Sequence, residues 1–309
     1  ITGPIRQDGP IDHIIKKSGT PTMGGVIIII GIITSTLLWA DLKNVYVWTL
    51  IFVSLALGGL GLLDDILKIK YKNSQGLKSR YKFLGQIVIG IITLLILIKY
   101  SNHEYLDNLY FPFFKNLIWN MGLFFIPFAL FVIIGASNAV NLTDGLDGLA
   151  TVPVMLVAIS FTLISYVVGN TIFSDYLQIQ YIPDVGELSI FCGSIVGACL
   201  GFLWYNAPPA KIFMGDTGSL SLGGSLAAIA IIVKHEIVLA IVGGLFVLET
   251  VSVIIQVASF KLTGKRIFRM APIHHHFEKK GWAESTIVIR FWIIAIILAL
   301  VGLATLKLR

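Results

Sequence analysis

Five aspartates stand at the ends of long apolar segments, in a chain that has only 17 acidic residues among 309. They are Asp64, Asp65, Asp144, Asp147 and Asp216. Carboxylate oxygens suit a hard divalent cation, which can take phosphate oxygens as its remaining ligands. Acids gathered at one membrane surface, amid basic loops, therefore predict an enzyme that acts on a phosphate-bearing substrate.

The elements that must position these acids are membrane helices. Hydrophobic residues make up 56% of the chain and charged residues only 13%. A spanning helix needs about 20 mostly apolar residues, whereas a barrel would need a period-2 alternation that this sequence lacks. We therefore predict an all-α polytopic integral membrane protein, with a single transmembrane domain over residues 1–309. The nine expected spans cover approximately residues 24–40, 45–63, 84–99, 118–137, 149–168, 188–204, 218–233, 237–260 and 289–306.

Lysine and arginine residues set the expected orientation. If residues 1–23 face the cytoplasm, that side holds sixteen of the 23 basic residues, and six lie on the opposite side. Membrane proteins keep their basic loops preferentially in the cytoplasm. All five aspartates are then expected at the cytoplasmic face. The other segments on that face are 64–83, 138–148, 205–217 and 261–288.

Asp64 and Asp65 close the second apolar segment. Adjacent residues of a helix point about 100° apart, so the two carboxylates would not face one ion in the same way. One is then available to a metal and the other to a proton. The structural alternative is an acidic pair that is merely solvated at the end of a helix.

The other acids lie in segments rich in turn-forming residues. Segment 138–148 contains two Asn, two Asp and two Gly, and is expected to present oxygen ligands and backbone amides to a polar ligand. An ordinary turn is the alternative. Asp216 lies between Gly215 and Gly218 near the start of a helix, where the helix dipole favours a carboxylate. Phe213 is placed to stack on a base, although core packing is the more usual role of a Phe.

Two further segments could hold phosphate groups. Residues 16–25 read KKSGTPTMGG and enter the first expected helix, so that Lys17, Thr22 and free amides could form an anion site. Residues 274–276 are three consecutive histidines. They cannot all converge on one ion from a helix, so hydrogen bonding to a diphosphate or acting on its protons is favoured over metal ligation.

Together these motifs closely resemble the bacterial phospho-N-acetylmuramoyl-pentapeptide transferase family, within the polyprenyl-phosphate N-acetylhexosamine-1-phosphate transferases. The segment MAPIHHHFE favours this family over the relatives that transfer GlcNAc-1-phosphate. The resemblance implies ten membrane helices, the first of which is expected to be missing before residue 1. The matching segments are KKSGTPTMGG, GLLDD, LKSRYKFLGQ, NAVNLTDGLDGLA, NAPPAKIFMGDTGSL and KRIFRMAPIHHHFE.

The resemblance also implies a reaction and its participants. Phospho-MurNAc-pentapeptide would move from UDP-MurNAc-pentapeptide to undecaprenyl phosphate, giving lipid I and UMP in peptidoglycan synthesis, with Mg²⁺ as the cofactor. The implied setting is the bacterial cytoplasmic (inner) membrane, with the active site on its cytoplasmic face. The implied partners are these substrates, membrane lipids and a second copy in a homodimer, with no nucleic acid.

Site residues carry over from the resemblance in two groups. Catalytic roles are implied for Asp64, Asp65, Asp216 and His275, with Asp216 as the magnesium ligand. The second group consists of residues implied to bind the nucleotide, the diphosphate or the lipid phosphate. Its members are Lys17, Thr22, Lys82, Asn141, Asp144, Gly145, Leu146, Asp147, Asn206, Phe213, Gln256, His274 and His276.

Three alternatives stay open at this point. The lipid phosphate is expected to attack directly, with Asp64 or Asp65 as a proton acceptor or positioning group, and a covalent phospho-aspartyl intermediate is the competing mechanism. A related enzyme that uses UDP-GlcNAc would carry the same acidic motifs. A secondary transporter also has membrane acids and histidines, but it would place them near the middle of the bilayer.

Overall fold

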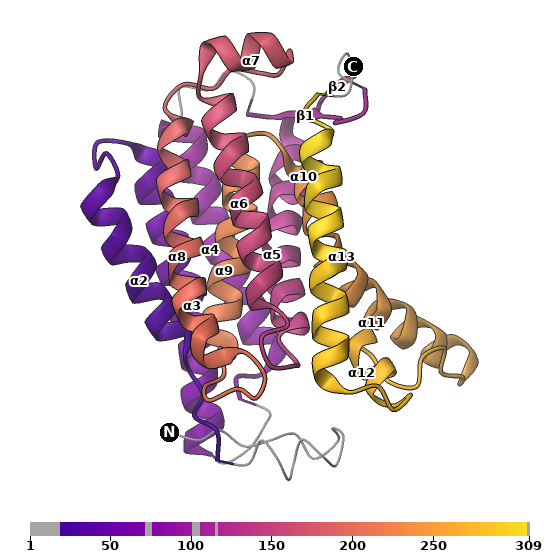
Figure 1. The fold of residues 1–309 in the computed structure, drawn as a ribbon. Helices are drawn as coiled ribbons and strands as arrows, with labels where there is room; N and C mark the ends of the chain where they lie inside the picture. Colours follow the sequence, from indigo (N-terminus) through magenta and orange to yellow (C-terminus); the bar gives the residue numbers. More distant parts are fainter. Residues whose placement is uncertain (1–18, 72–75, 101–105, 115–116, 308–309) are drawn as a thin grey trace.

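The computed structural model describes residues 19–71, 76–100, 106–114 and 117–307. Long helices run side by side in one bundle, and a short hairpin lies at the end where the chain finishes (Figure 1). The helices are α2 (Gly25–Trp39), α3 (Val45–Lys70), α4 (Ser79–Tyr100), α5 (Phe125–Thr143), α6 (Thr151–Val168), α7 (Thr171–Leu177), α8 (Leu188–Asn206), α9 (Gly215–Ile232), α10 (Glu236–Val242), α11 (Gly244–Thr263), α12 (Ile273–Glu278) and α13 (Glu284–Ala304). The hairpin pairs β1 (Asn108–Tyr110) with β2 (Ile118–Asn120), and 3-10 turns η1 (Gly122–Phe124) and η2 (Val185–Glu187) precede α5 and α8.

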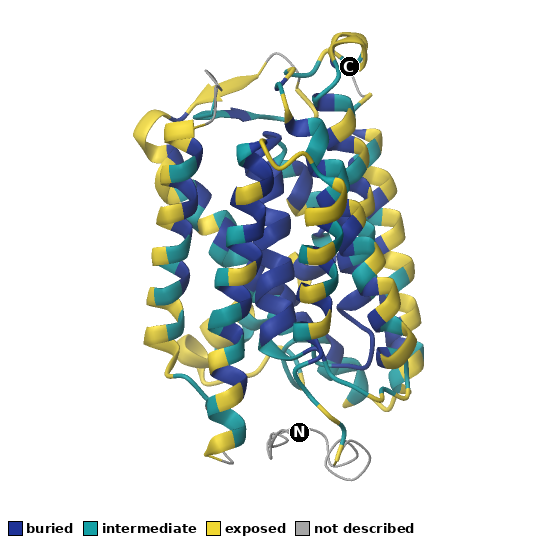
Figure 2. Cartoon of the chain, turned by 90° about the vertical axis from the view of Figure 1, so that its left-hand side faces the viewer, coloured by how far each residue is buried: buried dark blue, intermediate teal, exposed yellow. Residues whose placement is uncertain are grey.

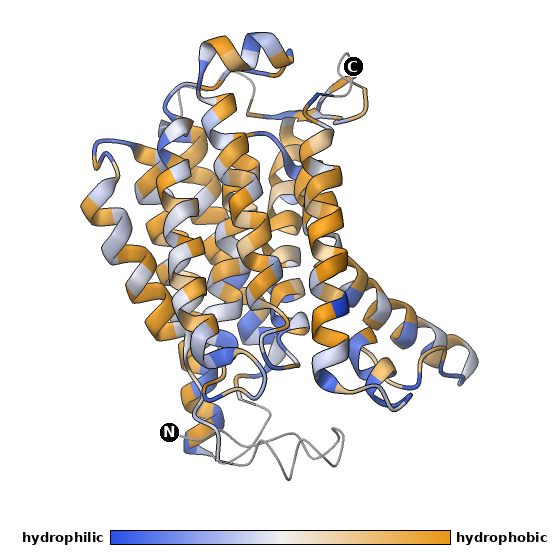
Figure 3. Ribbon diagram, viewed as in Figure 1, coloured by the Kyte–Doolittle hydropathy of each residue, from blue (hydrophilic) through white to orange (hydrophobic). Residues whose placement is uncertain are grey.

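Within the described ranges, eight helices are long and apolar enough to cross a membrane. Apolar residues predominate along these helices, while polar residues are most frequent near their ends (Figure 3). The remaining expected span, 24–40, corresponds to α2, which is apolar but has only 15 residues. The all-α polytopic membrane fold is therefore confirmed. The eight helices are Val45–Lys70, Ser79–Tyr100, Gly122–Thr143, Thr151–Val168, Val185–Asn206, Gly215–Ile232, Gly244–Thr263 and Glu284–Ala304.

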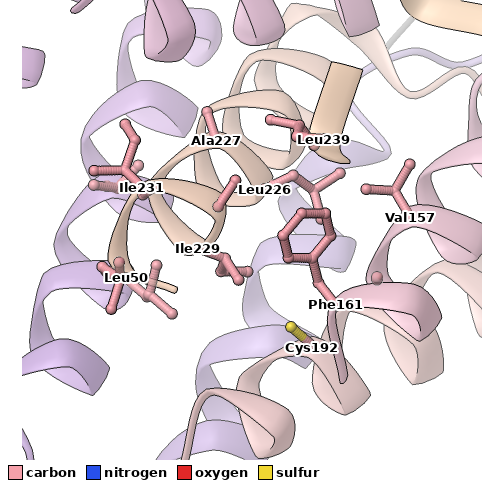
Figure 4. Packing of buried hydrophobic residues seen from close by; sticks show 14 of the residues in the cluster. Leu50, Val157, Phe161, Cys192, Leu226, Ala227, Ile229, Ile231 and Leu239 are labelled. Carbon is pink, nitrogen blue, oxygen red and sulfur yellow. The ribbon is translucent and has the colours of Figure 1, made fainter. Parts of the chain in front are cut away.

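Helix α9 forms the centre of the bundle. Of its 18 residues 16 are buried, and α2, α3 and α5 all pack against it. Figure 2 shows this buried centre surrounded by helices whose outer faces are exposed. Its sequence is rich in Gly, Ala and Ser, and small residues let membrane helices approach closely. Towards the end remote from the acids, Leu226 and Ile229 pack with Phe161 of α6 and Cys192 of α8 (Figure 4).

Two expected loops begin later than predicted. The second span was expected to end at residue 63, but α3 continues to Lys70 and places Asp64 and Asp65 inside the helix. Packing against α9 and a Lys68–Asp64 ion pair one turn apart stabilise this extension. Segment 138–148 was expected to be a turn, but α5 continues to Thr143, so only its second half is a loop.

Two expected spans are also interrupted. Residues 118–120 form strand β2 rather than the start of a helix, because they pair with β1. Segment 237–260 breaks at Gly243, where α10 ends and α11 begins. After this break, α11 leaves the bundle and runs outward (Figure 1). Both interruptions lie within apolar sequence, where hydropathy alone does not distinguish a helix from a strand or a bend.

Candidate active site

The first turn of α9 touches the last turns of α3. A Cβ on Gly61 would lie 2.2 Å from the backbone oxygen of Asp216, so this approach requires glycine. It brings together acids that are far apart in the sequence: one carboxylate oxygen each of Asp64, Asp65 and Asp216 lies within 4.8 Å of the others. Asp64 and Asp65 are buried, and Asp216 is partly exposed. The expected gathering of these acids at one end of the bundle is confirmed.

Asp65 binds the start of α9. The backbone N–H of Asp216 donates to Asp65 Oδ1 over 3.2 Å, and the N–H of Thr217 donates to Oδ2 over 3.0 Å. The Thr217 hydroxyl donates to Oδ2 as well, over 2.8 Å. The first N–H groups of a helix have no partner within the helix. Asp65 therefore satisfies donors of α9 and fixes the position of the neighbouring Asp216.

Asp64 and Asp216 share a lysine. Lys68 Nζ lies 2.6 Å from Asp64 Oδ2 and 2.9 Å from Asp216 Oδ2. Lys82 Nζ from α4 lies 2.7 Å from the same Asp216 oxygen, and Asn141 Nδ2 of α5 donates to Asp216 Oδ1 over 2.8 Å. Three carboxyl groups thus face two ammonium groups.

Backbone hydrogen bonds dock residues 21–25 onto the segment before α9. The N–H of Phe213 donates to Pro21 O over 2.8 Å, and the N–H of Gly24 donates to Phe213 O over 2.8 Å. Gly215 follows with a φ of +75°, and a Cβ there would lie 3.3 Å from Thr22 Oγ1. Thr22 and Phe213 therefore lie beside the start of α9. Lys17 lies outside the described residues.

The loop after α5 is tied to the loop after α8. Asp144 is the first residue after α5. Asp147 is buried, and its Oδ2 accepts the N–H of Ala210 over 2.9 Å. Asn206 is also buried: its Oδ1 accepts the Thr151 hydroxyl over 2.8 Å. The two side chains hold the loops in place, so their predicted contacts with substrate would add to this internal role.

Leu146 lies in the same loop but points inward. Its side chain is buried in a small apolar cluster with Leu149, Leu245 and Phe291. A contact between Leu146 and a ligand would therefore use its backbone. Gly145 lies directly before it and packs against His274, because a Cβ at this glycine would lie 2.3 Å from His274 Nε2.

The three histidines of α12 point to three different partners. His274 is fully buried, with Nδ1 3.1 Å from Glu249 Oε1. His275 Nδ1 lies 2.5 Å from Glu278 Oε2. His276 Nδ1 accepts the backbone N–H of Arg269 over 3.0 Å. The expectation that they do not converge on one ion agrees with this geometry.

The loop before α12 is held by Gln256 of α11. Its Oε1 accepts the backbone N–H groups of Ile267 and Phe268 over 3.1 and 2.9 Å, and its Nε2 donates to Phe268 O over 2.8 Å. His276 packs edge-on against the Phe268 ring. Partial burial, followed by the positive charges of Lys280 and Arg269, lowers the pKa of His276 from its ordinary value.

Sequence comparison with known proteins identifies the family of this chain. The family model described as glycosyl transferase family 4 matches residues 47–234, and a phospho-N-acetylmuramoyl-pentapeptide-transferase signature matches residues 17–29. A phospho-N-acetylmuramoyl-pentapeptide-transferase of Pelagibacter ubique (strain HTCC1062) is 69% identical over 309 residues, which are 100% of this chain and 86% of that relative. Its counterpart in Rhodopseudomonas palustris (strain BisB18) is 60% identical over 307 residues, 99% of this chain and 85% of the relative.

The chain belongs to the phospho-N-acetylmuramoyl-pentapeptide-transferase family. It is therefore an enzyme, a transferase, and the resemblance of its motifs to this family is confirmed. Members of one family at this level of identity share a fold, so the acid cluster of this chain lies within the fold that the family shares.

The acid cluster fits a hard divalent cation. Asp64, Asp65 and Asp216 offer oxygen donors within 4.8 Å of one another, at the end of the bundle where α9 begins. Mg²⁺ prefers oxygen ligands and keeps part of its coordination shell for water or phosphate. The excess of carboxyl groups over the ammonium groups of Lys68 and Lys82 also favours a cation. Asp216, the ligand that the family resemblance implies, would hold the ion, with the oxygens of Asp64 and Asp65 beside it.

Sequence reasoning missed two charged residues of this region. Lys68 follows Asp64 by four positions and Asp65 by three, and this helical spacing could have identified it. Glu249 is an acid in the middle of an apolar segment, which is itself a signal of function in a membrane helix. Its partner His274 follows 25 positions later, so only the fold reveals their contact.

Proposed function

We propose that this chain transfers phospho-MurNAc-pentapeptide from UDP-MurNAc-pentapeptide to undecaprenyl phosphate, releasing UMP and forming lipid I in peptidoglycan synthesis. The observation that carries the proposal is the cluster of Asp64, Asp65 and Asp216 with Lys68 and Lys82 at one end of the bundle. The named relatives add support, because they align with this chain over nearly its whole length. Mg²⁺ is the proposed cofactor.

The chemistry requires two anions to meet. A phosphoryl transfer of this kind depends on neutralising charge and on aligning the attacking oxygen with the leaving group. Bound Mg²⁺ would supply a Lewis acid for the diphosphate. Lys68 and Lys82 offer further positive charge beside Asp216, and Asn141 holds the other oxygen of that carboxylate. The site thus presents cations to phosphate and fixed acids to a metal.

The two adjacent acids take different roles in this proposal. Asp65 is engaged by three donors at the start of α9, so we assign it to positioning. Asp64 is held by Lys68 and by the N–H of Leu77, and the lysine can move from it towards a phosphate. Asp64 is therefore the proposed proton acceptor or orienting group. The lipid phosphate is already anionic at neutral pH and attacks directly.

The proposed setting is the bacterial inner membrane, with the acid cluster facing the cytoplasm where UDP-sugars are made. The excess of Lys and Arg on that side supports this orientation. A homodimer and bound membrane lipids complete the proposed assembly. Reporters fused within 100–117 and within 261–288 test the orientation, and finding both on one side of the membrane would refute it.

UMP release is the direct test of the reaction. Purified protein is given UDP-MurNAc-pentapeptide and undecaprenyl phosphate with and without Mg²⁺. Release should need both substrates and the metal, and should fall about 100-fold or more in Asp216→Asn. Asp175→Asn, an exposed acid on α7, is the matched control and should keep wild-type activity.

Other outcomes point to the alternatives. Release with UDP-GlcNAc but not with UDP-MurNAc-pentapeptide would identify the related GlcNAc-1-phosphate enzyme. A burst of UMP without lipid acceptor would support a phospho-aspartyl intermediate over direct attack. If thermal unfolding measurements show that the protein is folded and it releases no UMP from either donor, the proposed reaction is refuted.

A further inference from the structure

Glu249 is a buried acid in the second turn of α11 that the proposed mechanism does not use. Its side chain is fully buried, and it lies on the inward face of α11 with Leu245, Ser252 and Gln256, one turn apart each. Most of the other residues of α11 are exposed or partly exposed. An acid without compensation in an apolar interior costs several kcal/mol, so a residue of this kind needs a specific partner.

The partner is His274 of α12. Its Nδ1 lies 3.1 Å from Glu249 Oε1, and both side chains are 0% exposed. Within the part of the chain that the structure describes, neither the Glu249 carboxylate oxygens nor the His274 ring nitrogens have a hydrogen-bond partner, so the two side chains meet in a close polar contact that lacks hydrogen-bond geometry. The carboxylate is the polar group that faces Nδ1 of the buried ring, and a proton on Nδ1 would let it orient that ring.

The opposite edge of the His274 ring faces the loop after α5. A Cβ on Gly145 would lie 2.3 Å from Nε2, so the loop rests directly on the ring. The next histidine packs against the same ring, with the centroids of His274 and His275 4.1 Å apart and the ring planes tilted by 58°. A rotation of His274 would therefore displace both Gly145 and His275.

We propose that Glu249 is a positioning residue that sets the orientation and tautomer of His274, and through it the loop 144–148. This inference rests on the proposed function, in which the loop binds the nucleotide part of the donor. Glu249 does not touch the substrate. Its removal should therefore weaken binding of the UDP substrate, because the loop moves, and leave binding of the lipid phosphate unchanged.

A purely structural pair would behave differently. Loss of one partner would reduce the fraction of folded protein, which lowers kcat and leaves both KM values unchanged. A buried ion pair can often be replaced by apolar side chains of similar size without loss of stability. The apolar double variant Glu249→Leu with His274→Leu thus separates the two roles: it should fold, but it lacks the fixed imidazole.

The experiment measures KM for UDP-MurNAc-pentapeptide and for undecaprenyl phosphate in Glu249→Gln, in the apolar double variant and in wild type. We expect the KM for the nucleotide substrate to rise about 10-fold or more in both variants, and the KM for the lipid to stay within about 2-fold. Ser252→Ala, one turn away on the same face of α11, is the matched control and should retain both wild-type KM values.

Amide hydrogen exchange of residues 144–148 gives a second readout that needs no substrate. Exchange should be about 10-fold faster in Glu249→Gln than in wild type or Ser252→Ala. Unchanged exchange together with an unchanged nucleotide KM would overturn the inference. If wild type releases no UMP at all, the proposed function fails, and hydrogen exchange alone still decides whether Glu249 positions the loop.

Discussion

Replacing Gly61 by alanine tests whether the contact between α3 and α9 sets the geometry of the acid cluster. The new Cβ would lie 2.2 Å from the backbone oxygen of Asp216 and 2.6 Å from the nitrogen of Thr217. Both are backbone atoms, so no side-chain rotation can relieve the overlap. An ordinary contact of about 3.5 Å requires the helices to separate by about 1.3 Å, and overpacking of this kind costs about 1–3 kcal/mol.

That separation would act on the hydrogen bonds of Asp65. The bond from the Thr217 N–H is 3.0 Å long, so it would stretch to about 4 Å, beyond hydrogen-bonding distance. A displacement of about 1 Å in a catalytic site costs about 100-fold in rate. We therefore expect Gly61→Ala to lower kcat/KM for UMP release about 100-fold, while thermal unfolding still shows a cooperatively folded protein.

Gly59 provides the matched control for this substitution. It lies on the same helix two residues earlier, and a Cβ there meets nothing within 4 Å. Gly59→Ala should retain wild-type activity and should be at least as stable, because alanine favours helix more than glycine. If Gly61→Ala is as active as Gly59→Ala, close packing of α3 on α9 does not determine the catalytic geometry, and the reasoning is refuted.

Three further substitutions test single contacts of the site. Asp65→Asn presents an amide nitrogen to the N–H donors of α9, so it should lower the free energy of unfolding by about 1–3 kcal/mol. It should also lower the rate of UMP release. Unchanged thermal unfolding would contradict the assignment of Asp65 to positioning the start of α9. Lys82→Met should reduce UMP release about 100-fold, whereas Lys78→Met, an exposed lysine one turn earlier, should not. In an NMR titration His276 should titrate below the ordinary value of about 6.5. Folding is then favoured by the neutral imidazole above that ordinary pKa, and this contribution is lost as the pH falls through the lowered pKa. Lys280→Gln should raise the midpoint by part of the shift, because burial is the larger cause, and an unchanged midpoint would contradict a contribution from the charge of Lys280.

Membrane helices could be predicted well from the sequence because their signal is local. Each expected apolar segment overlaps a helix of the structure, while the orientation expected from the basic loops stays a prediction. Boundaries were predicted less well because tertiary contacts decide them. Helix α3 extends beyond its apolar segment because Asp64 pairs with Lys68 and Asp65 accepts hydrogen bonds from the start of α9. The break at Gly243 and the strand β2 likewise depend on neighbours that hydropathy does not report.

The candidate site likewise has a part that could be predicted from the sequence and a part that could not. Asp64, Asp65 and Asp216 could be grouped from topology alone, because alternate ends of spanning helices meet at one membrane surface. The contacts within the site could not, since Lys82 and Asn141 reach Asp216 only through the packing of α4 and α5. Asn206 and Gln256 show another limit: both were predicted as ligand contacts, and in the structure both brace loops. Their roles towards substrate stay predictions.

Helix α9 is enclosed by other helices, and this enclosure affects how the helix is inserted into the membrane. This helix has the lowest mean hydropathy of the eight spans, and almost none of its surface would meet lipid. A segment of that composition gains little from entering the bilayer alone. Its insertion therefore depends on protein neighbours that are already present, and α2, α3 and α5 all precede it in the chain. The order of synthesis thus delivers the surrounding helices to the membrane before the helix that carries Asp216.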